Sequence, residues 1–303
     1  MSARRSFQIE TWTELGVAIL IVILRIGIRY KTVGVPKFRI DDYLIIPTLL
    51  FFIITSVLGV LVYDYGSISG LSADQILNLG PAERTKIELG GKLNVVSWAG
   101  YVCCIWFSKA CLLGYYNSFT NLSWQQKRFL KISAVAVAAT FVGVLLTVLA
   151  HCSPIQNNWR TDIAPSYNCQ YGYINVYVAY ACHLSTDLLL LCIPIPIIHN
   201  LLQTRLSFGR KGLLIICLCT GTFTIAAAVT TLIISLSIQS NAGVGVLWGN
   251  REQFVWIVFL NTPSIFSVFK TEVWSSSPKA FATSCAELDY CIQPSQPASP
   301  RIG

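Results

Sequence analysis

The sequence predicts an all-α membrane protein, built as a bundle of seven transmembrane helices. Hydrophobic residues make up 54% of the 303 positions and charged residues only 12%, whereas a soluble domain carries about a quarter charged residues. So little charge cannot cover the water-facing surface of a chain this long. The sequence lacks the alternating ten-residue segments of a transmembrane β-barrel, which leaves helices as the spanning elements.

Seven apolar runs are long enough for a bilayer core, which takes about 20 residues of helix. We expect spans at residues 12–30, 43–63, 93–117, 130–150, 173–202, 213–239 and 253–269. Residues 12–270 are thus a seven-helix membrane domain. Residues 1–11 are predicted to form a short extracellular N-terminus. Residues 271–303 are rich in Ser and Pro and are predicted to form a disordered cytosolic tail.

Prolines are expected to shape three of these spans. The segment PAERTKIELGGKLN begins at Pro81, a typical helix start, so the third helix is predicted to extend beyond the membrane. Pro194 and Pro196 are expected to kink the fifth helix and Pro263 the seventh, because proline has no amide hydrogen to donate. Asn261 lies close to the carbonyls that Pro263 frees, which makes it a candidate internal polar residue.

Basic residues indicate the orientation of the chain. The net charge is +8, and the Lys and Arg residues lie in short loops between apolar runs. No basic groove with interleaved aromatics is present, so no nucleic-acid partner is expected. The first, third and fifth loops and the tail contain fourteen basic residues, against seven on the other side. The positive-inside rule therefore places the N-terminus outside and the C-terminus in the cytosol.

The stretch HCSPIQNNWRTDIAPSYNCQ, residues 151–170, falls between the fourth and fifth spans on the extracellular side. That side is oxidising, which permits a disulfide between Cys152 and Cys169, worth about 3 kcal/mol for a loop of this length. Cys103 and Cys104 lie too deep in the third span to compete as partners. A metal site and free thiols are the alternatives. Trp159 is expected to anchor the loop at the membrane interface or to cover the helical cavity.

Two charged residues lie inside predicted spans, where charge is costly and indicates function by default. Lys109 lies near the cytosolic end of the third helix, and Asp187 lies near the middle of the fifth. They are expected to pair with each other, or Lys109 extends toward Asp41 or Asp42. A structural pair between helices and a role in binding a ligand or a proton are both open readings.

His183 precedes Asp187 by four residues, so both lie on one face of the fifth helix. The pair is a candidate for binding a proton or orienting a ligand, and equally for a hydrogen bond that settles packing. Asn175, earlier in the same helix, is a further polar candidate for a ligand cavity. Only three His residues occur in the chain, and they cannot all converge, so no metal site is expected.

Asp41 and Asp42 stand at the start of the second helix, where carboxylates cap backbone amides and favour the helix dipole. Arg25 and Arg29 are close in sequence. We expect these four residues to form a charge clamp at the cytosolic surface.

Five short stretches follow one another in a definite order between residues 12 and 270. They are Arg29 followed by RIDDYLI; Lys109 followed by a tyrosine pair in SKACLLGYYNSF; Cys152, Pro154, Trp159 and Cys169; Asn175 and Asp187 followed by LCIPIPII; and the helix around Gly221. Their order and spacing resemble the fungal rhodopsin-like, or satratoxin-cluster-protein-4-like (SAT4), integral membrane family, which overlaps the Pth11-type receptors. The resemblance implies a seven-helix receptor-like architecture.

Neither a retinal cofactor nor a conventional G-protein partner is expected. A retinal Schiff base needs a lysine within the seventh helix, and the only lysine there is Lys270, at its cytosolic end. The third helix ends at Asn117 and lacks the Asp-Arg-Tyr arginine of rhodopsin-class receptors. No catalytic or cofactor motif is present, so an enzymatic activity is not predicted from a signature.

Three functions remain as hypotheses, the last of them a structural membrane protein with no ligand. The first is a plasma-membrane protein of receptor-like architecture, with the lipid bilayer and an extracellular or lipid-soluble cue as its partners. The second is a membrane enzyme or transporter of a fungal secondary-metabolite pathway, which the resemblance allows because some relatives lie in biosynthetic clusters. In that case His183 and Asp187 would act as an acid–base pair. The sequence does not indicate the oligomeric state.

Overall fold

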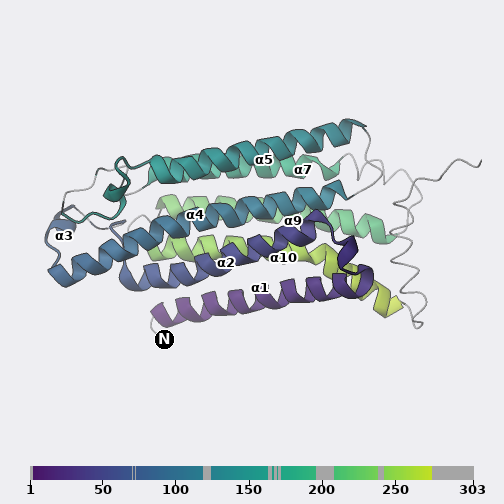
Figure 1. The fold of residues 1–303 in the computed structure, drawn as a ribbon, viewed down its shortest axis with the longest axis horizontal. Coiled ribbons are helices and arrows are strands. Elements are labelled where there is room, and N and C mark those ends of the chain that lie inside the picture. The colour runs from purple at the N-terminus through teal and green to yellow at the C-terminus, as the bar shows by residue number, and fades with distance from the viewer. Residues whose placement is uncertain are drawn as a thin grey trace, which may run out of the picture.

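The computed structural model describes residues 3–69, 71, 73–118, 124–162, 166, 169, 172–195, 208–237 and 242–274. Seven of its helices have 20 residues or more and form a bundle (Figure 1). They are α1 (Ala3–Val33), α2 (Ile40–Tyr65), α4 (Pro81–Asn117), α5 (Trp124–Ala150), α7 (Tyr173–Cys192), α9 (Phe208–Ser237) and α10 (Ala242–Trp274). The shorter elements are η1 (Val35–Lys37), α3 (Ala73–Leu77) and η2 (Ile155–Asn158).

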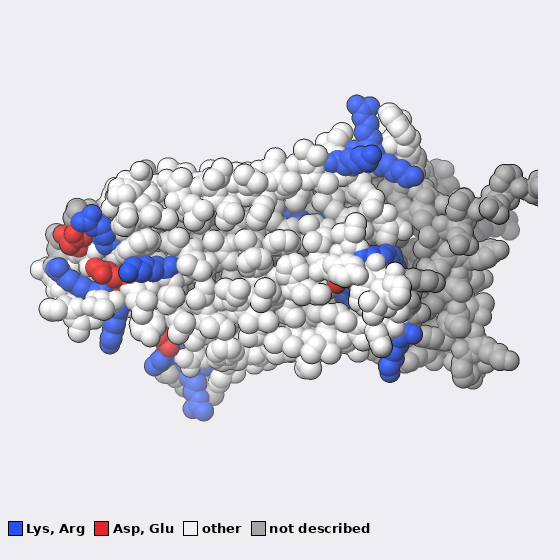
Figure 2. Space-filling model, viewed as in Figure 1, with Lys and Arg blue, Asp and Glu red and all other residues white. Residues whose placement is uncertain are grey.

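Several of the long helices have the length and composition of membrane spans. Five of them, α1, α2, α4, α5 and α7, are long and apolar enough to cross a bilayer, and the described apolar part of α9, Gly221–Leu236, is shorter. The middle of the face shown in Figure 2 is almost free of Lys, Arg, Asp and Glu, which gather toward its two ends. The chain is therefore a multi-pass membrane protein, as the sequence predicted.

The long helices contact one another in a closed ring, in the order α1, α2, α4, α5, α7, α9, α10 and back to α1. Helix α4 also contacts α7 and α10, and α10 also contacts α2. Helices α4 and α10 therefore lie at the centre of the packing. The N-terminus, α3 and the loop after α5 lie at one end of the bundle (Figure 1), which we call the α3 end.

Helix boundaries differ from the predicted spans in ways that have local causes. Helix α4 begins at Pro81, as expected, with the Glu83 carboxylate accepting a hydrogen bond from the Gly80 amide at 3.4 Å. Helix α7 ends at Cys192, just before Pro194, and residues 196–202 of the predicted 173–202 span lie outside the described part of the chain. Pro194 cannot donate to the carbonyl of Leu190, which instead accepts the Ile193 amide in a tighter turn at 3.3 Å.

Helices α1 and α10 are longer than predicted. Residues 3–11 form the first turns of α1. The sequence had predicted them as an N-terminal segment outside the membrane domain. Helix α10 begins at Ala242 rather than at Gln253. The predicted tail starts with the last turn of α10, which ends at Trp274, and residues 275–303 lie outside the described part of the chain. The earlier start of α10 matters most, because it places residues 250–253 inside the bundle.

Small residues let α2 and α4 approach closely. A Cβ atom on Gly90 would lie 1.7 Å from the carbonyl oxygen of Gly66, the residue that ends α2 with a φ of 77°. Further along, a Cβ atom on Gly100 would lie 2.8 Å from the Thr55 methyl group. The α2–α4 interface therefore depends on glycine in α4.

We predict that Gly90→Ala lowers the free energy of unfolding by about 1–3 kcal/mol or more, because the added methyl group must push two backbones apart. The matched control is Gly143→Ala in α5, where an added Cβ atom meets nothing within 4 Å. Thermal unfolding of the purified protein in detergent micelles measures both. Equal melting temperatures for the two variants would contradict the close approach.

Candidate functional site

Charged and polar side chains from three helices meet inside the bundle. Helix α4 supplies Lys109, α7 supplies His183, Thr186 and Asp187, and α10 supplies Glu252; all five are buried. The α7 residues come together because positions i, i+3 and i+4 share one helix face. We call Lys109, His183, Asp187 and Glu252 the charge cluster.

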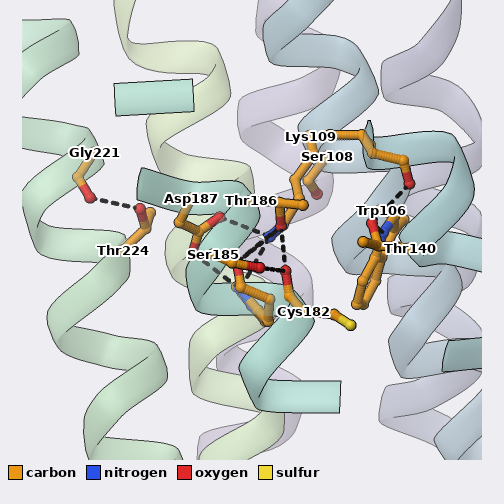
Figure 3. Close-up of polar contacts among 12 residues, drawn as sticks. Trp106, Ser108, Lys109, Thr140, Cys182, Ser185, Thr186, Asp187, Gly221 and Thr224 are labelled. Atoms are coloured by element: carbon orange, nitrogen blue, oxygen red, sulfur yellow. Dashed lines mark hydrogen bonds and ion pairs between the residues drawn. The ribbon is translucent and has the colours of Figure 1, made fainter. Parts of the chain in front are cut away.

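Lys109 extends from α4 to α7 and meets three oxygen atoms there (Figure 3). Its Nζ atom forms an ion pair with Asp187 Oδ1 at 2.7 Å, and it donates hydrogen bonds to Thr186 Oγ1 at 2.6 Å and to the His183 carbonyl oxygen at 2.8 Å. The pairing of Lys109 with Asp187 is thus the arrangement in the structure, and the alternative contact with Asp41 or Asp42 is not.

His183 lies between two carboxylates. Its Nδ1 atom is 2.9 Å from Asp187 Oδ2, and its Nε2 atom is 2.9 Å from Glu252 Oε1. Nδ1 also lies 3.1 Å from Lys109 Nζ, but three oxygen atoms lie nearer to that ammonium group. Two ring nitrogens that each face a carboxylate oxygen suit an imidazolium, in which both nitrogens donate. With His183 charged, the cluster contains two cations and two anions.

Two tyrosines extend the charge cluster toward the α3 end. The Tyr101 hydroxyl donates to Glu252 Oε2 at 2.9 Å and lies 3.4 Å from the Tyr180 hydroxyl. Helices α4, α7 and α10 therefore share one continuous polar network.

Aromatic rings enclose the cluster. The Trp106 ring centre lies 5.3 Å from Lys109 Nζ and 6.1 Å from the His183 ring centre. Tyr180 and Trp256 lie 6.2 and 6.5 Å from the same imidazole. A cation over an aromatic face gains attraction from the ring, and apolar walls strengthen every charge interaction inside them.

Sequence reasoning missed Glu252 and its neighbours. The residues Asn250, Arg251, Glu252 and Gln253 are consecutive in α10, and together they contact α1, α2 and the charge cluster. Asn250 donates to Glu14 of α1 at 2.7 Å and Arg251 pairs with Glu10 of α1. Gln253 Oε1 accepts from Thr55 of α2 at 2.9 Å. The sequence does contain a signal for them, a run of four polar residues. The predicted span began only at Gln253, so the first three of the four were placed in a loop.

The predicted charge clamp occurs at the opposite end from α3. Arg25 Nη2 lies 2.7 Å from Asp41 Oδ2 and 3.3 Å from Asp42 Oδ1, and Arg29 Nε lies 3.0 Å from Asp42 Oδ2. Asp42 also accepts from the Arg39 amide at 3.1 Å, so it caps α2 as expected. Arg25 is buried, and its Nη1 donates to the Leu260 carbonyl of α10 at 2.7 Å.

Asn261 belongs to the neighbourhood of the clamp rather than to the charge cluster. Its Nδ2 atom donates to the Ile257 carbonyl at 2.6 Å, one turn back along α10. The carbonyl before it, that of Leu260, accepts from Arg25. Asn261 therefore supplies a hydrogen bond to a backbone carbonyl of α10 close to Pro263. The Pro263 side chain itself lies outside the described residues.

The disulfide expected between Cys152 and Cys169 is present, with its Cα atoms 5.3 Å apart. Trp159 anchors this loop on α4, where a Cβ atom on Gly91 would lie 2.8 Å from the Trp159 Cβ atom. Lys92 Nζ lies 5.9 Å from the centre of the Trp159 ring. Trp159 thus packs on the first turns of α4, after Pro81. It does not line the cavity that lies nearby at the α3 end.

Asn175 lies apart from the charge cluster, in a cavity of about 60 Å³ at the α3 end. Its Nδ2 atom is 2.9 Å from His151 Nδ1. Burial lowers the pKa of His151 below its ordinary value, so its ring is neutral at pH 7. Of the five predicted polar candidates, Lys109, Asp187 and His183 come together, whereas Asn175 and Asn261 lie toward opposite ends.

Metal ligands are not grouped in the part of the chain that the structure describes: no set of three or more His, Cys, Asp and Glu side chains is arranged to hold an ion. The carboxylates of the charge cluster instead face Lys109 and His183.

A model of the fungal rhodopsin domain matches residues 24–269, most of the chain. The chain belongs to the fungal rhodopsin domain family. The resemblance found in the motifs is therefore confirmed at the level of this family. No curated protein and no solved structure matches the chain. The Lys270 side chain lies outside the described residues, and the expectation that the protein forms no retinal Schiff base stays a prediction.

We predict that Lys109→Met costs about 3–5 kcal/mol of unfolding free energy, because it leaves the buried Asp187 carboxylate without its ammonium partner. The double variant Lys109→Met/Asp187→Asn keeps the His183–Glu252 pair balanced and should be more stable than the single variant. Unfolding in detergent micelles measures both.

The control for this cycle is Asp162→Asn, which breaks the exposed ion pair with Arg160 and should change stability little. Additive effects of the Lys109 and Asp187 substitutions, within about 0.5 kcal/mol, would contradict a direct interaction between them.

Proposed function

We propose that the protein is a receptor-like sensor of the plasma membrane, with seven spanning helices, an extracellular N-terminus and a cytosolic C-terminus. The excess of basic residues in the loops opposite the α3 end supports this orientation. The Cys152–Cys169 disulfide supports it as well, because disulfides persist on the oxidising side of a membrane. The α3 end then faces the exterior and meets an extracellular or lipid-soluble cue.

The single observation that carries this proposal is the charge cluster at the crossing of α4, α7 and α10. Helix α4 connects it to both ends of the bundle. Toward the exterior, Trp98 of the cavity contacts the Tyr101 ring at 5.9 Å, and Tyr101 donates to Glu252. Toward the cytosol, Cys111 Sγ lies 3.3 Å from the Asp41 carbonyl oxygen, beside the charge clamp. Contiguous packing of this kind is the physical means by which two sites couple.

A membrane enzyme or transporter is the alternative, with His183 and Asp187 as an acid–base pair. The geometry favours it less. Asp187 is engaged by Lys109 and by His183, and His183 is engaged by Glu252 on its other nitrogen. An acid–base pair must reach the proton of a substrate, whereas these groups face one another. Charged groups that bind one another in this way suit a structural switch between helices better than catalysis on a substrate.

The conservative variant Tyr101→Phe tests the proposal. It removes one hydroxyl from the link between the cavity and Glu252 and leaves the four charges in place. In a null strain of the source organism, the variant should reach the surface at wild-type abundance but reproduce most of the transcript changes of the null strain. Transcript profiling together with untargeted metabolite profiling measures the outcome.

The matched control is Tyr177→Phe, which alters an exposed tyrosine on α7 and should restore the wild-type profile. Normal signalling by Tyr101→Phe would refute the proposed link. A null strain that loses a metabolite while keeping its transcript responses to external cues would instead favour the enzyme or transporter.

A further inference from the structure

The cavity at the α3 end is lined by polar and apolar groups from several elements. Asn94 and Trp98 come from α4, His151 and Asn158 from the disulfide loop, and Asn175 from α7. Cys169 also lines it, so the disulfide holds the loop at its wall. The cavity is therefore framed by rigid helices and a covalent cross-link, which is the setting of a preformed site.

Asn175 presents an unpartnered polar atom there. The side chain is only 6% exposed, and its Oδ1 atom has no hydrogen-bond partner. His151 Nδ1 faces both the Asn175 amide, at 2.9 Å, and the Val148 carbonyl oxygen, at 3.0 Å. If the Asn175 amide is flipped so that its oxygen accepts from a protonated His151 Nδ1, its NH₂ group becomes the group without a partner. Either way, one polar group of Asn175 lacks a partner, which is costly when buried.

The chemistry of the described lining selects against charged ligands. Ser69, Asn94, Asn158 and Asn175 are neutral, and the buried His151 ring is neutral at pH 7 because desolvation lowers its pKa. An ion in such a place would lose hydration without meeting an opposite charge. The amides and the imidazole instead match a molecule with its own hydrogen-bond donor and acceptor.

Size and shape restrict the ligand further. A cavity of about 60 Å³ holds only a few non-hydrogen atoms. One part of its wall is apolar, formed by Val95, Trp98, Val148 and Val176. A molecule that fits has a small apolar part against these side chains and a polar group toward Asn175.

We propose that this cavity binds a small uncharged molecule carrying an amide or hydroxyl group, held by Asn175 and His151 and packed against Trp98. The ligand class rests on the proposed receptor function, since it describes the cue that such a sensor would meet at its outer end. Trp98 contacts Tyr101, so an occupied cavity lies one side chain away from the network that contains Glu252.

Two molecules of the same shape and different charge test the site. Acetamide and acetate are isosteric, and only acetamide is neutral and donates hydrogen bonds. Saturation-transfer NMR on the purified full-length protein in lipid nanodiscs at pH 7.5 should show binding of acetamide and none of acetate. Asn175→Leu should weaken acetamide binding by about tenfold, the effect of losing one buried hydrogen bond.

A second variant guards against misfolding of the first. Val95→Phe should fill the cavity while leaving the Asn175–His151 contact intact, and it too should abolish the acetamide signal. The control is Gln156→Ala, an exposed position of η2 outside the lining, which should bind acetamide as the wild type does. Circular dichroism confirms that each variant is folded.

Three results would overturn the proposal. Equal signals from acetamide and acetate, or wild-type acetamide binding by both cavity variants, would show non-specific contact. The absence of any acetamide signal would show that the cavity holds water only. The binding measurement needs no cellular response, so it is separable from the test of Tyr101→Phe: acetamide binding with normal signalling by Tyr101→Phe keeps the site and rejects the coupling.

Discussion

The ion pair between Lys109 and Asp187 is the interaction on which the arrangement of the bundle depends. Both side chains lie in an apolar interior, where an unpaired charge costs several kcal/mol. Their 2.7 Å contact removes that cost only when α4 and α7 are at one depth and one rotation relative to each other. The same requirement applies to α10, because His183 reaches Glu252 at 2.9 Å. A shift of any of these helices by one turn, about 5.4 Å, would leave a charge without its partner.

The polar residues of α10 extend this constraint to the other helices. Helix α10 contacts α1 through Asn250 and Arg251, α2 through Gln253, and the charge cluster through Glu252. A bilayer offers little hydrophobic drive for helices to associate, so packing and hydrogen bonds between helices decide their arrangement. The four consecutive polar residues of α10 supply those hydrogen bonds, and the glycines of α4 supply the close packing against α2.

Much of this architecture follows from patterns that a single sequence contains. Apolar runs indicate the helices, Pro81 indicates the extension of α4, and Cys152 and Cys169 indicate the disulfide once the loop is placed outside. Lys109 and Asp187 are recognisable because charge is rare in such runs. The sequence does not decide whether Lys109 pairs with Asp187 or reaches Asp41 or Asp42, because an uncertainty of a few residues in the helix boundaries changes the relative depth by several ångströms. Glu252 was missed because its run looked like a loop before the span. Tyr101 and Tyr180 resemble any other aromatic residue in an apolar helix, and only the packing reveals what their hydroxyls contact.

The state of the His183 ring tests the central claim most directly. The cluster is balanced, with two cations and two anions, only if both ring nitrogens carry protons. Nitrogen-15 NMR of the histidine-labelled protein in lipid nanodiscs at pH 7.5 reads this state, and His183→Gln identifies the His183 signals among the three histidines. The account predicts two protonated ring nitrogens for His183, each donating to a carboxylate. A His183 ring with one unprotonated nitrogen would contradict it.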